Sequence, residues 1–186
     1  YSYSSYDYNL ISAVIEGATG ESFLPWIARR VFGPMGMTRT GPDYPDSIIP
    51  WRAHAYVHAD SMAPAQNAPY VDNSYKWAGG GFLSTANDLA RFARNLLDGK
   101  LVKPEIRELL WTSQKLNDGK ETGYGIGWGS TRDSAGRRRI GHTGGAMGGT
   151  SNLIIYPEQG LVLALCVNSD RTFIGALPAI AERFLK

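Results

Sequence analysis

The chain has 186 residues, of which 43% are hydrophobic and 19% charged, so it can bury a substantial core and is too apolar to be disordered. Its 19 lysines and arginines against 17 acidic residues give a formal charge of +2, which does not favour a nucleic-acid partner. No apolar run reaches membrane-spanning length, and we expect no membrane insertion.

Cys166 is the only cysteine, which excludes an internal disulfide and a thiolate metal cluster. It lies in the apolar run 161–167, where we expect a buried thiol that packs as a small hydrophobe. His54 and His58 lie among Pro, Ala and Tyr, where a loop or short strands are favoured over a zinc-binding helix. The sequence therefore predicts no metal site and no cofactor.

Two helices are expected near the start of the chain. Residues 7–18 have apolar side chains at helical spacing, which predicts one buried face, and Gly20 closes this helix. Ser22 can cap the next helix, Pro25 is tolerable within its first turn, and Gly33 ends it.

The composition then changes over residues 41–75, which are rich in Pro, Asp, Asn, Ala, His and Tyr and have no sustained period. This pattern predicts an extended excursion with short strands. A loop of this length in a compact domain is usually a lid or the wall of a site, or else disordered, and the aromatic residues favour an ordered one.

Two further helices follow a tight backbone passage at 78–81, Ala-Gly-Gly-Gly. Thr85 and Asp88 have the spacing of a capping pair, and an apolar stripe follows them. Pro104 starts a short helix that runs through Trp111.

Strands dominate the last third of the chain, at 124–130, 137–141, 152–156 and 161–167. A turn from Pro157 to Gly160, with positive φ at Gly160, joins the last two into a hairpin. The apolar runs on both arms indicate a sheet covered on both faces. A closing helix is marked by Phe173, Leu177, Ile180 and Phe184, and Pro178 limits where its regular part begins.

Helices, then antiparallel strands, then a closing helix predict an α+β fold. We expect residues 1–186 to be the C-terminal part of a single domain, with a mainly helical region at 1–115 and antiparallel strands with a C-terminal helix at 120–186. The chain begins within what looks like a site loop, which indicates a piece of a longer protein.

Three stretches could carry chemistry: Tyr-Ser-Ser at 3–5, the glycines 79–81 with the following Ser-Thr, and His-Thr-Gly-Gly at 142–145. Taken singly, the first is usually a turn and the second is usually close packing. The third is harder to dismiss, because glycines weaken a strand and its polar groups must be satisfied or exposed to a ligand.

In this order the stretches resemble the serine β-lactamase and penicillin-binding-protein superfamily, in particular its class C-like branch of β-lactamases, D,D-peptidases, D-aminopeptidases and esterases. The resemblance runs from Tyr3 to about Asn168, and it includes Pro-Met-Gly-Met at 34–37 and Gly-Gly-x-x-Ser-Thr-x-x-Asp-Leu at 80–89. It implies a β-lactamase/transpeptidase-like fold, a helical region plus an antiparallel sheet flanked by helices, incomplete at the N-terminus.

The resemblance also implies site residues. Tyr3 matches the tyrosine whose hydroxyl acts as general base or proton relay, and Ser5 stands where the family usually has a substrate-binding Asn. His142 replaces a lysine common in β-lactamases, and Thr143 and Gly144 complete that substrate-binding motif. A histidine is mostly neutral at pH 7, so it attracts a substrate carboxylate less than lysine does. This favours ester or peptide hydrolysis over hydrolysis of β-lactams.

Gly145 matches the residue whose backbone N–H forms one half of an oxyanion hole. The family's nucleophile is missing, because neither Ser-x-x-Lys nor Gly-x-Ser-x-Gly occurs in the 186 residues. We therefore expect the Ser-x-x-Lys motif upstream of Tyr1, in an N-terminal companion segment or chain.

Two hypotheses for function follow. The first is the C-terminal portion of a serine acyl hydrolase that acts on a small-molecule ester, amide or β-lactam through an acyl-serine intermediate. The alternative is a catalytically inactive family member or fragment that serves as a peptide-binding or assembly module, which Ser5 in place of Asn favours. A β-barrel binding module is poorly supported, because helices occupy much of the first half. The family has periplasmic, secreted and cytosolic members, and the first two are slightly favoured over a cytoplasmic location.

Overall fold

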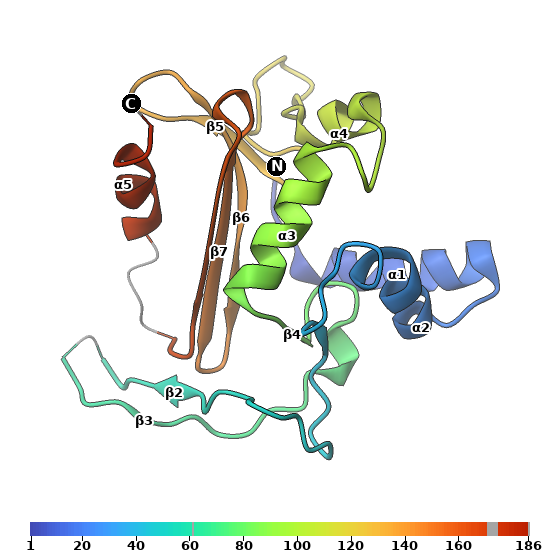
Figure 1. Cartoon of the computed structure of the whole chain (residues 1–186), viewed down its shortest axis with the longest axis vertical. Coiled ribbons are helices and arrows are strands. Elements are labelled where there is room, and N and C mark those ends of the chain that lie inside the picture. Colours follow the sequence, from blue (N-terminus) through green and yellow to red (C-terminus); the bar gives the residue numbers. More distant parts are fainter. Residues whose placement is uncertain (61, 171–174, 186) are drawn as a thin grey trace.

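The computed structural model of the chain describes residues 1–60, 62–170 and 175–185, and its centre is one antiparallel sheet with helices on both faces (Figure 1). The sheet follows chain order, and its strands are β5 (Gly129–Arg132), β6 (Arg138–Ala146), β7 (Gly149–Tyr156) and β8 (Leu161–Val167). Helix α3 (Ala86–Leu97) packs on one face and α5 (Ala176–Glu182) on the other. The predicted α+β class is confirmed.

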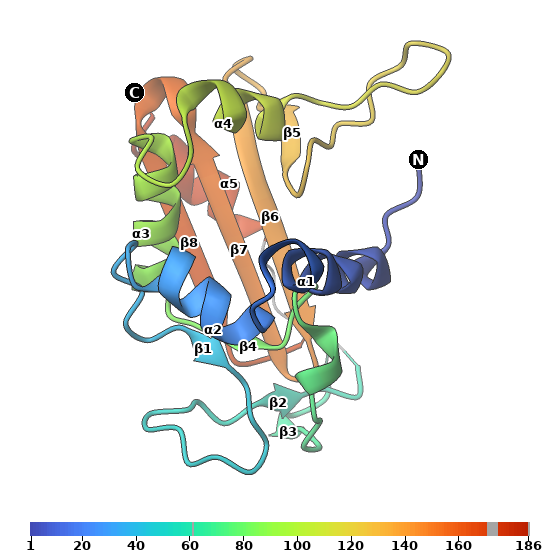
Figure 2. The ribbon, with the colours of Figure 1, turned by 90° about the vertical axis from the view of Figure 1, so that its right-hand side faces the viewer.

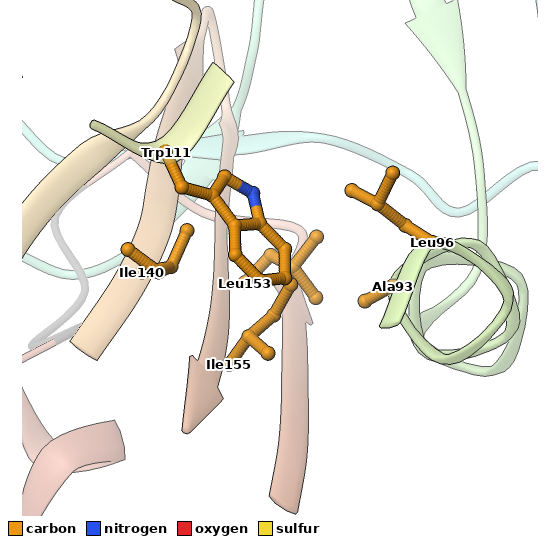
Figure 3. Close-up of a cluster of buried hydrophobic side chains, with 6 residues drawn as sticks. All are labelled: Ala93, Leu96, Trp111, Ile140, Leu153 and Ile155. Carbon is orange, nitrogen blue, oxygen red and sulfur yellow. The ribbon is translucent and has the colours of Figure 1, made fainter. Parts of the chain in front are cut away.

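Strand β7 contributes to two separate cores. Leu153 and Ile155 face α3 and pack with four other buried side chains, Ala93, Leu96, Trp111 and Ile140 (Figure 3). Ile154 and Tyr156 face the other way, where they pack with Leu177, Ala181 and Leu185. Because successive side chains of a strand point to opposite faces, the apolar run is buried on both, as its composition predicted.

The hairpin between β7 and β8 has the predicted turn, in which Gly160 takes a φ of 62° after a short 3₁₀ turn, Pro157–Gln159. Cys166 on β8 is exposed, so the expectation of a buried thiol is wrong. Desolvation raises the pKa of this thiol, so it stays protonated at neutral pH and is not a primed nucleophile.

The strand predicted at 124–130 is wrong, because β5 begins only at Gly129. Before it the chain folds into a tight turn, in which the Gly125 N–H donates to the Trp128 carbonyl at 2.7 Å and Gly127 takes a φ of 79°. Strand β6, by contrast, runs past its predicted end at 141 through the glycines. Strand β7 pairs with it as far as Ala146, opposite Gly149, which explains the extension.

The helical region contains α1 (Ser5–Thr19), α2 (Phe23–Ile27) with a π-helical turn at Ala28–Phe32, and α4 (Pro104–Trp111). Helix α1 ends at Gly20, which has the predicted left-handed conformation with φ 70°. The predicted cap by Ser22 is wrong, since its side chain makes no capping bond. The Glu16 carboxylate instead accepts from the Phe23 N–H at 2.8 Å.

The apolar stripe of α1 is not covered. None of the 15 described residues of this helix is buried, and Leu10, Ile11 and Val14 are 61%, 41% and 67% exposed. The helix prediction is therefore confirmed, whereas the burial of its apolar face is not found among the described residues.

Helix α3 begins with half of the predicted capping pair. Thr85 Oγ1 accepts from the Asp88 N–H at 3.2 Å. The Asp88 carboxylate is fully buried and does not return to the cap, because it accepts from the Arg39 N–H at 2.7 Å, from Thr40 Oγ1 at 3.0 Å and from Arg91 Nη1 at 2.9 Å. Asp88 thus ties the segment after α2 to α3.

The excursion at 41–75 has the short strands that its composition predicted. Strand β1 (Gly41–Pro42) pairs with β4 (Phe82–Leu83), and β2 (Tyr56–Val57) pairs with β3 (Gln66–Asn67). The pair β2–β3 lies beyond the β6–β7 turn (Figure 1), where a Cβ on Gly148 would strike Ala55 and Ala68. This part of the excursion therefore packs under one end of the sheet.

The closing helix buries only part of the face expected. Leu177 and Ala181 are buried, whereas Ile180 and Phe184 are 46% and 68% exposed. Phe173 lies outside the described residues. None of the helices in the described part of the chain is long and apolar enough to cross a membrane.

Candidate active site

Three aromatic rings from distant parts of the chain meet beside β6. The ring of Tyr3 lies 6.0 Å from that of His142 and 5.8 Å from that of Tyr124, and the Tyr124 and His142 rings are 5.9 Å apart, measured between centroids. Tyr3 precedes α1, Tyr124 follows α4, and His142 lies on β6. The fold therefore brings together the predicted Tyr3 and His142 and adds a third residue that sequence reasoning missed.

Close packing of the glycine passage fixes the start of α1. A Cβ on Gly79 would strike the side chain of Asn9 and the backbone carbonyl of Ser5. Ser12 Oγ donates to the Trp77 carbonyl at 2.9 Å, which holds the same two segments together. Ser5, the predicted substrate contact, is the first residue of α1 and therefore lies in this fixed turn.

Both ring nitrogens of His142 have partners. Nδ1 lies 2.6 Å from the carbonyl oxygen of Thr143, and Nε2 lies 2.8 Å from the hydroxyl oxygen of Tyr124. Burial, followed by the neighbouring Tyr8, raises the pKa of Tyr124 above its ordinary value, so this phenol is uncharged at neutral pH.

The edge of β6 is open beside His142. Strand β5 pairs with β6 only as far as Gly141, which lies opposite Gly129. Beyond that point, in the described part of the sheet, β6 has β7 on one side and no strand on the other. Figure 2 shows α1 crossing in front of this part of the sheet. The edge could pair with an extended ligand through its backbone groups.

The two predicted glycines of this edge differ in their surroundings. A Cβ on Gly144 would strike the Ser151 side chain, whereas a Cβ on Gly145 would meet no described atom within 4 Å. Gly144 is therefore explained by packing against β7. Thr143 and Gly145 are both exposed, as groups that meet a substrate must be.

A hollow of about 170 Å³ opens beside the three rings. Tyr3 and Tyr124 line it together with Asp7, Tyr8 and the residues before Tyr3. Solvent or a small group can therefore reach the two tyrosines.

The only sequence signal for Tyr124 was its setting. It stands among three glycines: Gly123 and Gly127 have positive φ, and Gly125 lies close to the Leu110 carbonyl, so they support tight turns rather than the predicted alternating strand. A tyrosine held in a glycine-rich turn is a candidate site residue, but its partner on β6 is visible only in the fold.

A second cluster, Ser169 with His58 and Asp170, contains the residue types of a hydrolytic triad. The Ser169 hydroxyl lies 3.3 Å and the Asp170 carboxylate 3.4 Å from the same atom, Nδ1 of His58. In a triad the nucleophile and the carboxylate bind opposite ring nitrogens. Asp170 also accepts from the His58 N–H at 3.1 Å, so this cluster ties the excursion to the end of β8.

Comparisons with known proteins identify the family of the chain. The model of the Beta-lactamase family matches residues 1–183. "Serine beta-lactamase-like protein LACTB, mitochondrial" of Mus musculus is 36% identical over 183 residues, covering 84% of this chain and 33% of that protein. "Penicillin-binding protein 4" of Amycolatopsis lactamdurans is 29% identical over 180 residues, covering 90% of this chain and 47% of that protein.

Solved structures give the same result. A D-stereospecific amidohydrolase from Streptomyces sp. superposes with a TM-score of 0.78 at 27% identity, over 91% of this chain and 51% of that one. An octameric penicillin-binding protein homologue from Pyrococcus abyssi superposes with a TM-score of 0.83 at 23% identity, over 100% and 42%, which bears on the fold alone. The chain therefore spans between 33% and 51% of the length of these four proteins.

Proposed function

The chain belongs to the beta-lactamase family and has its β-lactamase/transpeptidase-like fold, and from this premise we propose that it is the C-terminal portion of a serine acyl hydrolase. The observation that carries the proposal is the convergence of Tyr3 and His142 next to the open, glycine-rich edge of β6. These residues are far apart in the sequence, and the fold brings them together.

In this proposal the nucleophilic serine and its lysine come from a companion segment N-terminal to Tyr1. The serine oxygen attacks the carbonyl carbon of the substrate, and its proton passes through the Tyr3 hydroxyl to the leaving group. The negative charge that develops on the carbonyl oxygen is stabilised by the Gly145 N–H together with the N–H of the serine. Water then hydrolyses the acyl-serine by the same route.

Substrate binding falls to the open edge of β6 and the first turn of α1. An extended acyl group pairs with the backbone at Thr143 and Gly144, as peptides add to sheet edges, while Ser5 approaches it from α1. His142 has partners on both ring nitrogens and so offers a substrate carboxylate no free N–H. This supports esters and amides over β-lactams, whose carboxylate needs a cation.

The alternative function is a catalytically inactive module that binds peptides or assembles with a partner. Ser5 in place of the usual Asn favours it, and an open strand edge can hold a peptide without any chemistry. The two functions differ in one respect, the covalent acyl-serine.

Labelling with a fluorophosphonate, which acylation-competent serines attack, distinguishes them. We expect the longer protein to be labelled at the serine of a Ser-x-x-Lys motif and to hydrolyse a chromogenic short-chain ester. The isolated 186-residue chain should do neither, because it contains no such motif.

The matched control is the longer protein with that serine changed to alanine, which should lose both label and turnover. A label on any serine within residues 1–186 would contradict the proposed division of the site. A longer protein that neither labels nor turns over would support the inactive module.

A further inference from the structure

The backbone of Tyr124 is held on both sides. Its carbonyl accepts from the Gln114 N–H at 2.8 Å and from Thr122 Oγ1 at 2.9 Å, and its N–H donates to Thr122 Oγ1 at 3.1 Å. These three hydrogen bonds hold the peptide groups of Tyr124 in place.

The next residues fix the same turn against α4. The Ile126 N–H donates to the Leu110 carbonyl at 2.8 Å, and a Cβ on Gly125 would collide with that carbonyl. The turn therefore cannot slide along α4, and the Tyr124 side chain is presented to β6 from a rigid support.

Hydrogen-bond chemistry then determines the tautomer of His142. A carbonyl oxygen can only accept, so the short contact with the Thr143 carbonyl requires the proton on Nδ1. In the neutral ring Nε2 is therefore an acceptor, and the Tyr124 hydroxyl at 2.8 Å donates to it. Burial and the neighbouring Tyr8 raise the pKa of Tyr124, so the phenol has a proton to donate at neutral pH.

We propose that Tyr124 is a positioning residue for His142: its hydroxyl and the Thr143 carbonyl together hold the imidazole in one tautomer and one orientation at the mouth of the site. The effect of this positioning on hydrolysis rests on the proposed function, whereas the hydrogen bond itself can be tested without any substrate.

Tyr124 and Tyr3 therefore have separate roles. Nε2 of His142 is engaged by Tyr124 and is not available to Tyr3, so the Tyr3 hydroxyl is left to the nucleophile and the leaving group. In this assignment Tyr124 acts through the imidazole ring that it holds.

Nitrogen NMR on the longer protein with ¹⁵N-labelled histidine tests the bond. We compare the wild type with Tyr124→Phe, which keeps the ring contact to Tyr3 but removes the hydroxyl, and we assign the signals with His142→Gln. Tyr6→Phe is the control, because Tyr6 is 74% exposed on α1.

In the wild type we expect a protonated Nδ1 and an Nε2 signal displaced toward that of a hydrogen-bonded acceptor. Tyr124→Phe should move Nε2 toward the position of a bare ring nitrogen and leave Nδ1 protonated, whereas Tyr6→Phe should change neither signal. A proton on Nε2 in the neutral wild type, or an Nε2 signal unaffected by Tyr124→Phe, would overturn the assignment.

Ester hydrolysis is the second measurement. Loss of one hydrogen bond to a neutral ring should lower kcat/KM about fivefold to tenfold in Tyr124→Phe. An unchanged kcat/KM beside a moved Nε2 signal would overturn the positioning role. If no variant hydrolyses any ester, the proposed function fails, and the NMR result still decides whether Tyr124 holds His142.

Discussion

The Tyr3 hydroxyl is the group whose loss most directly tests the chemistry at the scale of single residues. The ring is already placed by its contacts with Tyr124 and His142, which Tyr3→Phe preserves. In the longer protein we expect this change to lower kcat by about two to four orders of magnitude with little change in KM, because proton transfer and not binding is removed. Steady-state ester hydrolysis measures both constants. Tyr1→Phe is the control, and equal kcat values in Tyr3→Phe and the wild type would remove Tyr3 from the mechanism.

Two glycines of β6 make a second test at this scale, because a methyl group meets different surroundings at each. Gly145→Ala should leave the melting temperature unchanged, since its Cβ meets no described atom within 4 Å, but should lower kcat by a factor on the order of 10² by crowding the oxyanion. Gly141→Ala should instead destabilise the fold by about 1–3 kcal/mol, because its Cβ runs into the Leu153 carbonyl. Thermal unfolding beside ester kinetics measures the pair. A Gly145→Ala variant that loses stability and keeps activity would argue for a packing role only.

At the scale of elements, the buried carboxylate of Asp88 connects α3 to the segment after α2. Asp88→Ala leaves the Arg39 N–H and the Thr40 hydroxyl, both partly buried, without their acceptor, and we expect a loss of about 3 kcal/mol in the free energy of unfolding. On the same helix Asp98→Ala removes a more exposed ion pair with Arg94 and should cost only about 0.3–0.5 kcal/mol. Urea denaturation compares the two variants. Similar midpoints would mean that the hydrogen bonds of Asp88 stabilise little.

Most helices and strands could be predicted from the sequence. The predictions failed where the conformation or burial of a segment depends on the residues that pack against it. Gly-Ile-Gly-Trp-Gly at 125–129 alternates like a strand, yet its glycines serve a turn against α4 that only the fold supplies. The helical spacing of apolar residues in α1 predicted an apolar face, but spacing alone does not show which element packs on that face. In the site, Tyr3 and His142 could be found because they stand in recognisable motifs. Tyr124 could not, because its partner is set by where a loop lies against β6.

At the scale of the whole molecule, two surfaces besides the open edge of β6 lack a partner within the described residues: the apolar stripe of α1, and the edge of β8 away from β7, which has no neighbouring strand. An unpaired apolar strand edge exposes backbone groups that favour pairing with another strand. The N-terminal companion in our proposal would cover such an edge, and the relatives that the chain matches are longer than it is.

Hydrogen exchange tests this companion. The outward-facing amides of Leu161–Val167 should exchange more slowly in the longer protein than in the isolated chain, because a companion strand would bond them. Amides of β7, which has a neighbouring strand on each side, should be protected in both and serve as the internal reference. Equal protection of Leu161–Val167 in the two proteins would mean that the companion does not pair with β8.

Because both faces of β7 are buried, the changes of sequence that this strand can accept are limited. Deleting Asn152 while the pairing of the preceding residues with β6 is kept would turn Leu153 and Ile155 toward α5 and Ile154 and Tyr156 toward Trp111, so both cores would be disrupted together. Substitutions of similar volume remain open to such a strand, whereas insertions and deletions do not. Changes of chain length can accumulate instead in connections outside the sheet.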